Sequence, residues 1–395
     1  MMPTVNLNYG KLKNSYLFAN IAERVNAYSA LHPEQHLLRL GIGDVTQPLT
    51  PSVIAALHEA VDMQSRSDTF HGYMSECGYA PLRSAIAGYY RQRNVILKDS
   101  EVFVSSGASD ELGDILHLFE RSLDVILMEP AYPAYADANV MDGRMIHYMD
   151  ASDANGFTPP PPQESFQALI YICSPNNPTG AVFTRDLLKQ WVDYANQTGS
   201  VILFDAAYEV FISEADIPRS IYEIEGAKTC AIEISSLSKT AGFTGTRCGY
   251  TVIPEELVRD DMNLNAMWVR NRTTRTNGVS FIVQHGALAV FSDRGQKEVQ
   301  ELLSVYRMNA KNFMKALDEA GLKYFGGRNS PYIWMKCPDG MSGWETFDRL
   351  LEQAQIIGTP GEGFGKCGAG WFRFSMFADQ KDIEKAGSRI GAVLK

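Results

Sequence analysis

Short apolar runs alternate with amphipathic helical patterns between about residue 100 and residue 250. The apolar runs are EVFVSS (101–106), DVILM (124–128), ALIYIC (168–173), VILFD (201–205) and CAIEISS (230–236). The helical patterns are SDELGDILHLFER (109–121) and TRDLLKQWVDYANQTG (184–199). Apolar strands that alternate with helices predict an α/β fold, in which an open, mainly parallel sheet is covered by helices on both faces.

The pattern changes after about residue 290. One long helical pattern covers residues 296–321, a strand-like run follows at 332–337, and the chain closes with a further helical pattern. We expect these segments to form a smaller α+β domain that is completed by the N-terminal residues. The predicted division is a large domain at 45–290 and a small domain built from 1–44 and 291–395.

Composition and charge restrict the classes of function. The chain has 395 residues, of which 45% are hydrophobic and 21% charged, as is usual for a globular protein. Its formal net charge of −10 argues against nucleic acid or an anionic membrane as the main partner. No apolar run approaches the roughly 18 residues of a membrane-spanning helix, and the first residues show no signal-peptide pattern.

The cysteines and histidines show neither a disulfide pattern nor metal-ligand spacing. The cysteines are Cys77, Cys173, Cys230, Cys248, Cys337 and Cys367, and no two of them form a C-x-x-C pair. Such scattered cysteines are typical of free thiols in a reducing compartment. We therefore predict a cytoplasmic protein without a structural disulfide or a bound metal.

Four of the predicted strands end in residue types that carry chemistry. EVFVSSGASDELGD turns through a glycine into a helix, so that backbone N–H groups of Ala108 and Ser109 form an anion cradle. YICSPNNPTG ends in amides that include Asn177, VILFDAAYEV ends in Asp205, and EISSLSK ends in hydroxyls and a lysine. Ligands of open α/β sheets bind beyond the carboxyl ends of the strands, so these residues should converge on one crevice.

Each of these features alone has a simpler explanation. Asp205 could cap a helix, NNPTG could be an ordinary turn, and SSGASDE could be a helix N-cap without a ligand. A lone lysine after a strand, such as Lys239, is usually solvated. Their occurrence at successive strand ends of one sheet favours a shared binding site.

The set of groups matches the requirements of pyridoxal phosphate. An amine can attack its aldehyde, a carboxylate can keep its ring nitrogen protonated, and N–H groups, hydroxyls and an arginine can hold its phosphate. Lys239 would meet the aldehyde, Asp205 the ring nitrogen and Tyr132 the ring face. The phenolic oxygen would contact Asn177 and Tyr208, and the phosphate would contact Ala108, Ser109, Ser236, Ser238 and Arg247.

Three motifs resemble the fold-type I pyridoxal-phosphate aminotransferases, the relatives of aspartate aminotransferase. They are SLSKTAGFTGTRCGY, SPNNPTG and FDAAYE. The resemblance implies a large domain with a mainly parallel, seven-stranded sheet, and a smaller α+β domain from both chain ends. It also implies small amino-acid and 2-oxo-acid substrates, and a homodimer with shared active sites. Lys239, Asp205 and Tyr132 would then be the catalytic residues.

Further stretches resemble the LL-diaminopimelate aminotransferase family, among them LRLGIGDVTQPL (38–49), HGYMSECGYAPLR (71–83) and TNGVSFIVQ (276–284). This resemblance implies transfer of an amino group between L-glutamate and tetrahydrodipicolinate. It implies that Tyr16 and Gly43 line the substrate site and that Arg373 clamps the α-carboxylate. Tyr73 would reach the neighbouring subunit's phosphate site, and Glu76 and Asn277 the neighbour's substrate. Ser109, Tyr132 and Asn177 would also contact substrate, although Ser109 stands where plant members have lysine.

Other functions remain open at this stage. An aminotransferase for aspartate, alanine or aromatic substrates would use the same fold, as would a pyridoxal-phosphate lyase. The glycine-rich segments 41–46 and 361–368 lack the full dinucleotide fingerprint and are expected to be loops near the crevice. A transcription regulator would need a winged-helix domain before Tyr16, for which we expect no room.

Overall fold

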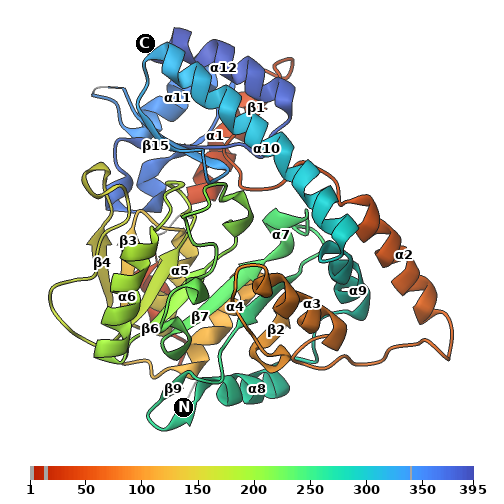
Figure 1. The fold of residues 1–395 in the computed structure, drawn as a ribbon. Coiled ribbons are helices and arrows are strands. Elements are labelled where there is room, and N and C mark those ends of the chain that lie inside the picture. Colours follow the sequence, from red (N-terminus) through yellow and green to blue (C-terminus); the bar gives the residue numbers. More distant parts are fainter. Residues whose placement is uncertain (1–3, 13–16, 339) are drawn as a thin grey trace.

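The large sheet carries the architecture of the molecule. The computed structural model describes residues 4–12, 17–338 and 340–395. Seven strands follow the order β2–β8–β7–β6–β5–β3–β4, as Figure 1 shows in part. Their bounds are β2 Val102–Ser105, β3 Asp124–Glu129, β4 Ile146–Asp150, β5 Ala168–Cys173, β6 Val201–Asp205, β7 Ala231–Ser236 and β8 Gly249–Val252. β8 runs antiparallel to the other six strands of this sheet, which are parallel to one another, and this confirms the predicted mainly parallel sheet.

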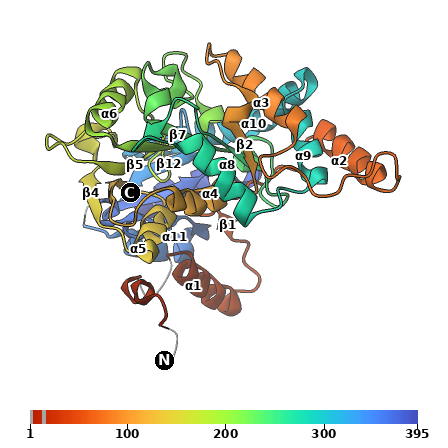
Figure 2. The same cartoon turned by 90° about the horizontal axis from the view of Figure 1, so that it is seen from below.

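Helices cover both faces of this sheet. The described α-helices are α1 Leu17–Leu31, α2 Pro51–Gln64, α3 Ala80–Arg91, α4 Ala108–Asp114, α5 Pro133–Asp142, α6 Arg185–Thr198, α7 Leu237–Thr240, α8 Leu264–Arg275, α9 Phe281–Val290, α10 Asp293–Ala320, α11 Gly343–Ala354 and α12 Gln380–Leu394. Figure 2 shows α6 on one side of the strands and α4 and α5 on the other. The helices explain why β5 and β6 are almost entirely apolar up to Asp205 at the end of β6, since every residue of both strands is buried.

The predicted helix over residues 109–121 is wrong in its length. Helix α4 begins at Ala108 and ends at Asp114, and a 3₁₀ turn, η3, follows at Ile115–Leu118. The buried side chains of Ile115 and Leu116 keep the apolar pattern going, so the sequence does not reveal where the helical hydrogen bonds change.

The second sheet joins both ends of the chain into a smaller α+β unit. It has the antiparallel order β11–β12–β15–β14, with β11 Tyr324–Gly326, β12 Tyr332–Lys336, β14 Thr359–Pro360 and β15 Trp371–Ser375. Beside it, β1 (Leu38–Arg39) pairs in parallel with β13 (Ile356–Ile357). A short hairpin of β9 (Val258–Arg259) and β10 (Met262–Asn263) lies at the end of the large sheet's unit that is farthest from the small sheet (Figure 1). Strand pairing thus brings the N-terminal segment onto the C-terminal unit, as predicted.

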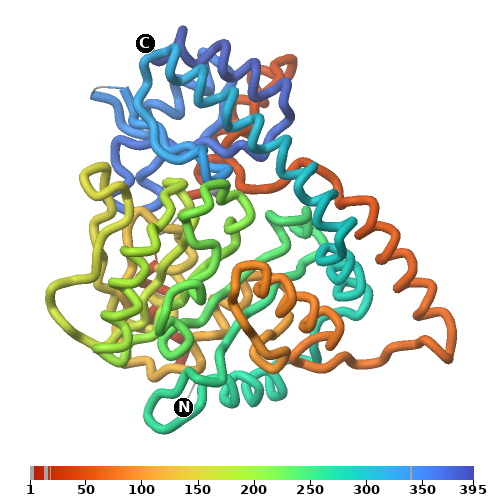
Figure 3. The backbone as a smooth tube through the Cα atoms, in the orientation of Figure 1, coloured from red at the N-terminus to blue at the C-terminus, as the bar shows by residue number. Residues whose placement is uncertain are grey.

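Helix α10 belongs to two hydrophobic cores. Its N-terminal half packs Val299, Leu303 and Tyr306 into the core around the large sheet. Its C-terminal half packs Phe313 and Leu317 into the core around the small sheet. Figure 3 traces it from the blue C-terminal region to α9 and α2. The domain division at residues 44/45 and 290/291 therefore stays a prediction, because no break in the structure marks it at α10.

No helix in residues 4–12, 17–338 and 340–395 combines the length and apolar character that a membrane crossing requires.

Candidate active site

A cavity of about 440 Å³ lies beyond the carboxyl ends of the parallel strands. Asp205 ends β6 and Ser236 ends β7, and both line the cavity. The other predicted site residues in its lining are Gly43, Ala108, Ser109, Tyr132, Asn177, Tyr208, Ser238, Lys239, Arg247 and Arg373. The structure therefore brings together groups that are separated by up to several hundred residues in the sequence.

Lys239 lies in the short helix α7, whose N-cap is Ser236. Its Nζ donates a hydrogen bond to the backbone carbonyl of Gly43. The pKa of Lys239 is lowered to about 8, mainly by burial and in smaller part by the positive charges of Arg247 and Arg373, while the negative charge of Asp44 opposes this shift. A substantial fraction of this amine is therefore neutral near physiological pH, as a nucleophile or base requires.

Asp205 is a buried carboxylate with two local hydrogen bonds. Its Oδ2 accepts from the Tyr135 hydroxyl (2.5 Å) and its Oδ1 from the backbone N–H of Ala207 (2.9 Å). Burial raises the pKa of Asp205, whereas the two hydrogen bonds lower it. A carboxylate in this setting gains stability from a positively charged partner in the cavity.

One end of the cavity is built to hold an anion. Gly107 is the N-cap of α4 and has φ +128°, a conformation that favours glycine. A Cβ at Gly107 would overlap the guanidinium of Arg247, so the glycine also leaves room for this arginine. Arg247 Nη1 donates to the Ser238 hydroxyl (3.2 Å). Backbone N–H groups at the start of a helix, hydroxyls and a guanidinium together favour a phosphate.

Arg373, which is 1% exposed, also lines the cavity. Its Nη1 donates to Asn177 Oδ1 (2.6 Å) and its Nη2 to the carbonyl of Gly41 (2.6 Å). Its guanidinium carbon lies 4.6 Å from the ring centre of Tyr332 and 4.9 Å from that of Phe364. These contacts fix the planar fork in one orientation. Because Asn177 Oδ1 accepts from Arg373, its amide NH₂ group is the part that can donate to a ligand.

Tyr132 and Tyr208 complete the lining on two further sides. Tyr132 is the N-cap of α5, and its ring meets that of Tyr135 edge to face, with centroids 5.6 Å apart. The hydroxyl of Tyr208 lies 2.8 Å from the hydroxyl of Tyr332. Both tyrosines are thus held by neighbouring aromatic side chains that the sequence analysis did not identify.

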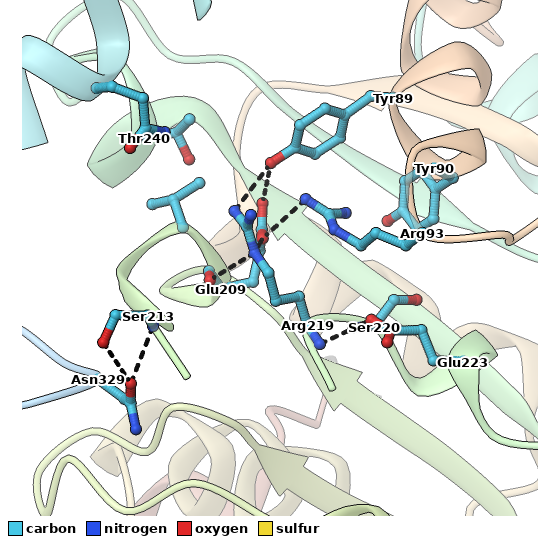
Figure 4. A network of polar contacts seen from close by, with 12 residues as sticks. Tyr89, Tyr90, Arg93, Glu209, Ser213, Arg219, Ser220, Glu223, Thr240 and Asn329 are labelled. Carbon is cyan, nitrogen blue, oxygen red and sulfur yellow. Dashed lines mark hydrogen bonds and ion pairs between the residues drawn. The ribbon is translucent and has the colours of Figure 1, made fainter. Parts of the chain in front are cut away.

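A charged network holds the segment that carries Tyr208, as Figure 4 shows. The carboxylate of its neighbour Glu209 accepts from the Tyr89 hydroxyl (2.8 Å) and pairs with Arg219 (2.7 Å) and Arg93 (3.3 Å). Arg219 also donates to the backbone carbonyl of Glu209 (3.1 Å). The network therefore fixes the turn between β6 and the 3₁₀ helix η5 (Glu209–Phe211).

Three predicted site residues lie outside the cavity of this chain. Tyr73 is 90% exposed and Asn277 is exposed. Glu76 accepts a hydrogen bond from the Thr273 hydroxyl (2.8 Å). Hydrogen bonds from its own backbone and from Thr273 lower the pKa of Glu76. A further predicted site residue, Tyr16, lies outside the described residues.

A buried arginine connects the Glu76 loop to the anion-binding end of the cavity. Arg272 pairs with Glu111 of α4 through Nη1 (2.7 Å), and its Nη2 donates to the carbonyl of Val104 in β2 (2.8 Å). Its Nε donates to the backbone carbonyl of Glu76 (3.2 Å). The loop is therefore anchored beside α4, although none of its side chains lines this chain's cavity.

Several cavity residues were not predicted. They are Ile42, Asp44, Leu112, Tyr135, Ala207, Thr244 and Tyr332. Leu112 and Tyr135 lie one helical turn after predicted residues, so helical spacing could have suggested them. Within the described residues, no cluster of three or more His, Cys, Asp or Glu side chains is arranged to hold a metal ion.

Comparisons with known proteins point to one family. The family described as aminotransferase class I and II matches residues 35–390. LL-diaminopimelate aminotransferase of Agathobacter rectalis is 48% identical, over 98% of this chain and 99% of the relative. The enzyme of the same name from Lachnospira eligens is 47% identical over the same shares.

Solved structures show the same likeness. The structure of L,L-diaminopimelate aminotransferase from Chlamydomonas reinhardtii has a TM-score of 0.94 and 36% identity, and each chain covers 100% of the other. A mutant aspartate aminotransferase of Thermus thermophilus has a TM-score of 0.87 at 21% identity over 100% of both chains, which shows the shared fold.

Proposed function

Because the chain belongs to the class I and II aminotransferases, among the LL-diaminopimelate aminotransferases, we propose that it transfers an amino group between L-glutamate and tetrahydrodipicolinate. The transfer consumes one water molecule, which opens the cyclic imine of tetrahydrodipicolinate, and its products are LL-2,6-diaminopimelate and 2-oxoglutarate. Identity of 48% over nearly the whole length of both chains is the observation that supports this reaction most strongly. Analysis of the products formed from glutamate and a panel of 2-oxo acids tests it against aspartate, alanine and aromatic acceptors, and against a lyase.

The residues of the cavity fit pyridoxal phosphate. An anion-binding end, a buried carboxylate and an amine of lowered pKa lie around one space of about 440 Å³. When bound, the cofactor supplies an aldehyde that reacts with amines and a ring that withdraws electrons from the substrate carbon. Ala108, Ser109, Ser236, Ser238 and Arg247 would hold its phosphate, Asn177 and Tyr208 its phenolic oxygen, and Tyr132 its ring face.

Lys239 and Asp205 would carry the proton chemistry. The Nζ of Lys239 would take the proton from the substrate Cα and deliver it to the aldehyde carbon of the cofactor. Its lowered pKa suits this role, because the amine must be neutral to accept a proton and charged to return it. Asp205 would hold the proton on the ring nitrogen, since a buried carboxylate stabilises a positive charge beside it. Arg373 would bind the substrate's α-carboxylate as a bidentate fork.

The positions of Tyr73, Glu76 and Asn277 outside the cavity of their own chain support a homodimer with shared sites. None of the three side chains lines the cavity of its own chain, and the exposed Tyr73 ring is a large aromatic group that a second copy can cover. In a two-fold dimer, each chain would lend these residues to the cavity of the other.

The cytoplasmic location stays a prediction from the cysteine pattern, although all six cysteines are free thiols in the structure.

Covalent uptake of pyridoxal phosphate by the cofactor-free protein should depend on pH through Lys239. Only the neutral amine attacks the aldehyde, so the second-order rate constant should rise with pH and level off above about pH 8. A solvated lysine would give a rate that still rises toward pH 10, near its ordinary pKa. Stopped-flow absorbance across this pH range measures the midpoint. A midpoint near 10 would show that the amine is not perturbed when the cofactor enters.

Replacing Glu76 by alanine should impair diaminopimelate far more than glutamate. Glu76 would recognise the distal ammonium group of diaminopimelate, which glutamate lacks, so we expect a loss of roughly 10²-fold in kcat/KM for diaminopimelate only. Glu76→Gln is the matched control, because it can still accept from Thr273 but has no charge.

Mixed dimers show whether Glu76 acts across the interface. Lys239→Ala and Glu76→Ala subunits are each inactive or weak on diaminopimelate, but one site of a mixed dimer would carry neither defect. Random mixing should then restore about a quarter of the wild-type sites, since about half of the dimers are mixed. Mixed dimers that are verified by mass and show no recovery would mean that each chain builds its own site.

A further inference from the structure

Tyr332 connects the small sheet to the candidate active site. It begins β12 of the small sheet, yet its side chain is 1% exposed and packs in the core around the large sheet. Its hydroxyl lies 2.8 Å from the hydroxyl of Tyr208, and the two ring centres are 5.1 Å apart at 70°. The motifs that predicted the site do not include this residue.

Two further site residues contact the same side chain. The guanidinium of Arg373 lies 4.6 Å from the centre of the Tyr332 ring, an arrangement that attracts the cation to the ring face. Gly43 lies so close to the Tyr332 hydroxyl that a Cβ there would overlap it. Tyr332 thus touches residues proposed to hold the cofactor's phenolic oxygen, the substrate's carboxylate and the wall of the substrate site.

We propose that Tyr332 is a positioning residue that donates its hydroxyl proton to Tyr208, so that Tyr208 can donate its own proton to the phenolic oxygen of the cofactor. This inference rests on the proposed function, because it assumes that pyridoxal phosphate binds in this cavity. It follows from counting protons. Each phenol has one proton, and the pair shares one hydrogen bond, so Tyr208 keeps its proton for a ligand only if Tyr332 is the donor.

The charges around the pair favour this direction. Burial raises the pKa of both phenols, but the nearby Arg373 lowers that of Tyr332, which makes Tyr332 the more acidic of the two. The more acidic phenol is the better hydrogen-bond donor. The other titratable groups that face the pair are Cys173, Asp205 and Tyr132. A phenol that accepts a hydrogen bond also becomes a stronger donor, so Tyr332 would strengthen the contact that Tyr208 makes.

The absorbance of the bound cofactor tests the direction of the bond. A hydrogen bond donated to the phenolic oxygen of the cofactor stabilises the negative charge on this oxygen. It therefore lowers the pKa of the proton that this oxygen shares with a neighbouring group. Tyr332→Phe keeps the ring but removes the hydroxyl that donates to Tyr208. The pH at the midpoint of the bound cofactor's absorbance change should then rise by about 0.5 unit, because the hydrogen bond from Tyr208 to the phenolic oxygen is weakened but not lost. Tyr208→Phe should raise the midpoint more, and adding Tyr332→Phe to it should cause no further change.

Tyr306→Phe is the matched control. Tyr306 lies in the same aromatic cluster, but its hydroxyl accepts from the backbone N–H groups of Thr46 and Gln47 and does not contact Tyr208. Its loss should affect stability and leave the midpoint unchanged. Because only folded protein binds the cofactor, the midpoint is read from the folded fraction even if a variant is unstable.

Two results would overturn the inference. A lower or unchanged midpoint in Tyr332→Phe would mean that Tyr208 is the donor or that the bond has no influence on the cofactor. A shift that persists in the Tyr208→Phe background would mean that Tyr332 acts by another route. The measurement needs no amino-acid substrate, so an error in the proposed substrate would leave it valid. Failure to bind the cofactor at all would refute the proposed function, and this inference with it.

Discussion

Replacement of Lys239 by alanine should lower kcat by at least about 10⁴-fold, because it removes both the covalent contact to the cofactor and the base that moves the substrate proton. The phosphate-binding end of the cavity does not depend on this side chain, so the variant should still bind pyridoxal phosphate noncovalently. Its absorbance should be that of the free aldehyde. Single-turnover kinetics measured with glutamate give the loss in the chemical step directly.

The Lys239→Ala variant also provides its own control. The cavity left by the missing side chain has room for a small primary amine, and addition of one should restore part of the rate by replacing the base. The increase should follow the neutral fraction of the added amine as pH rises. Wild-type turnover without any added amine would rule out the role of Lys239.

Replacement of Asp205 by asparagine should lower kcat by about 10²- to 10³-fold, the usual cost of losing one charged group that stabilises a transition state. Asparagine has nearly the same shape, and its side-chain oxygen can still accept from the N–H of Ala207. The melting temperature should therefore change little. This separation matters, because the bond to Ala207 shows that Asp205 also has a local structural role.

Tyr135→Phe is the matched control for Asp205. It removes the 2.5 Å hydrogen bond to the carboxylate but keeps the negative charge beside the ring nitrogen. We expect a much smaller loss of kcat than in Asp205→Asn. A collapse of the melting temperature in Asp205→Asn, with normal activity in the folded fraction, would show that the carboxylate is only structural.

The strands that the sequence predicts best are those buried on both faces. The apolar runs at 168–173 and 201–205 coincide with β5 and β6, since a strand covered by helices must be apolar throughout. The edge strand β4 was missed because its residues are exposed or only half-buried, and their mixed pattern resembles a loop. The four-residue β8 was missed because it is short and begins with a glycine.

The candidate site divides in a similar way. Asp205, Ser236 and Lys239 could be predicted because parallel strands place their carboxyl ends at one edge of the sheet. Tyr332 could not, because it enters the cavity from a strand of the other sheet, and its contact with Tyr208 spans 124 positions. The pair of Glu111 and Arg272 is hidden for the same reason, since its two residues are 161 positions apart.

The continuity of α10 has a consequence for how this chain can be divided or recombined. A fragment that stops at Val290 would contain the complete large sheet, but it would lose Val299, Leu303 and Tyr306 from the core around that sheet. The remainder would begin with the whole of α10, and the apolar side chains in the N-terminal half of this helix would have lost the large-sheet core against which they pack. Neither piece is therefore a module that could be expressed alone or exchanged between homologous enzymes at this boundary. Chimeras with other aminotransferases should have their junctions outside α10.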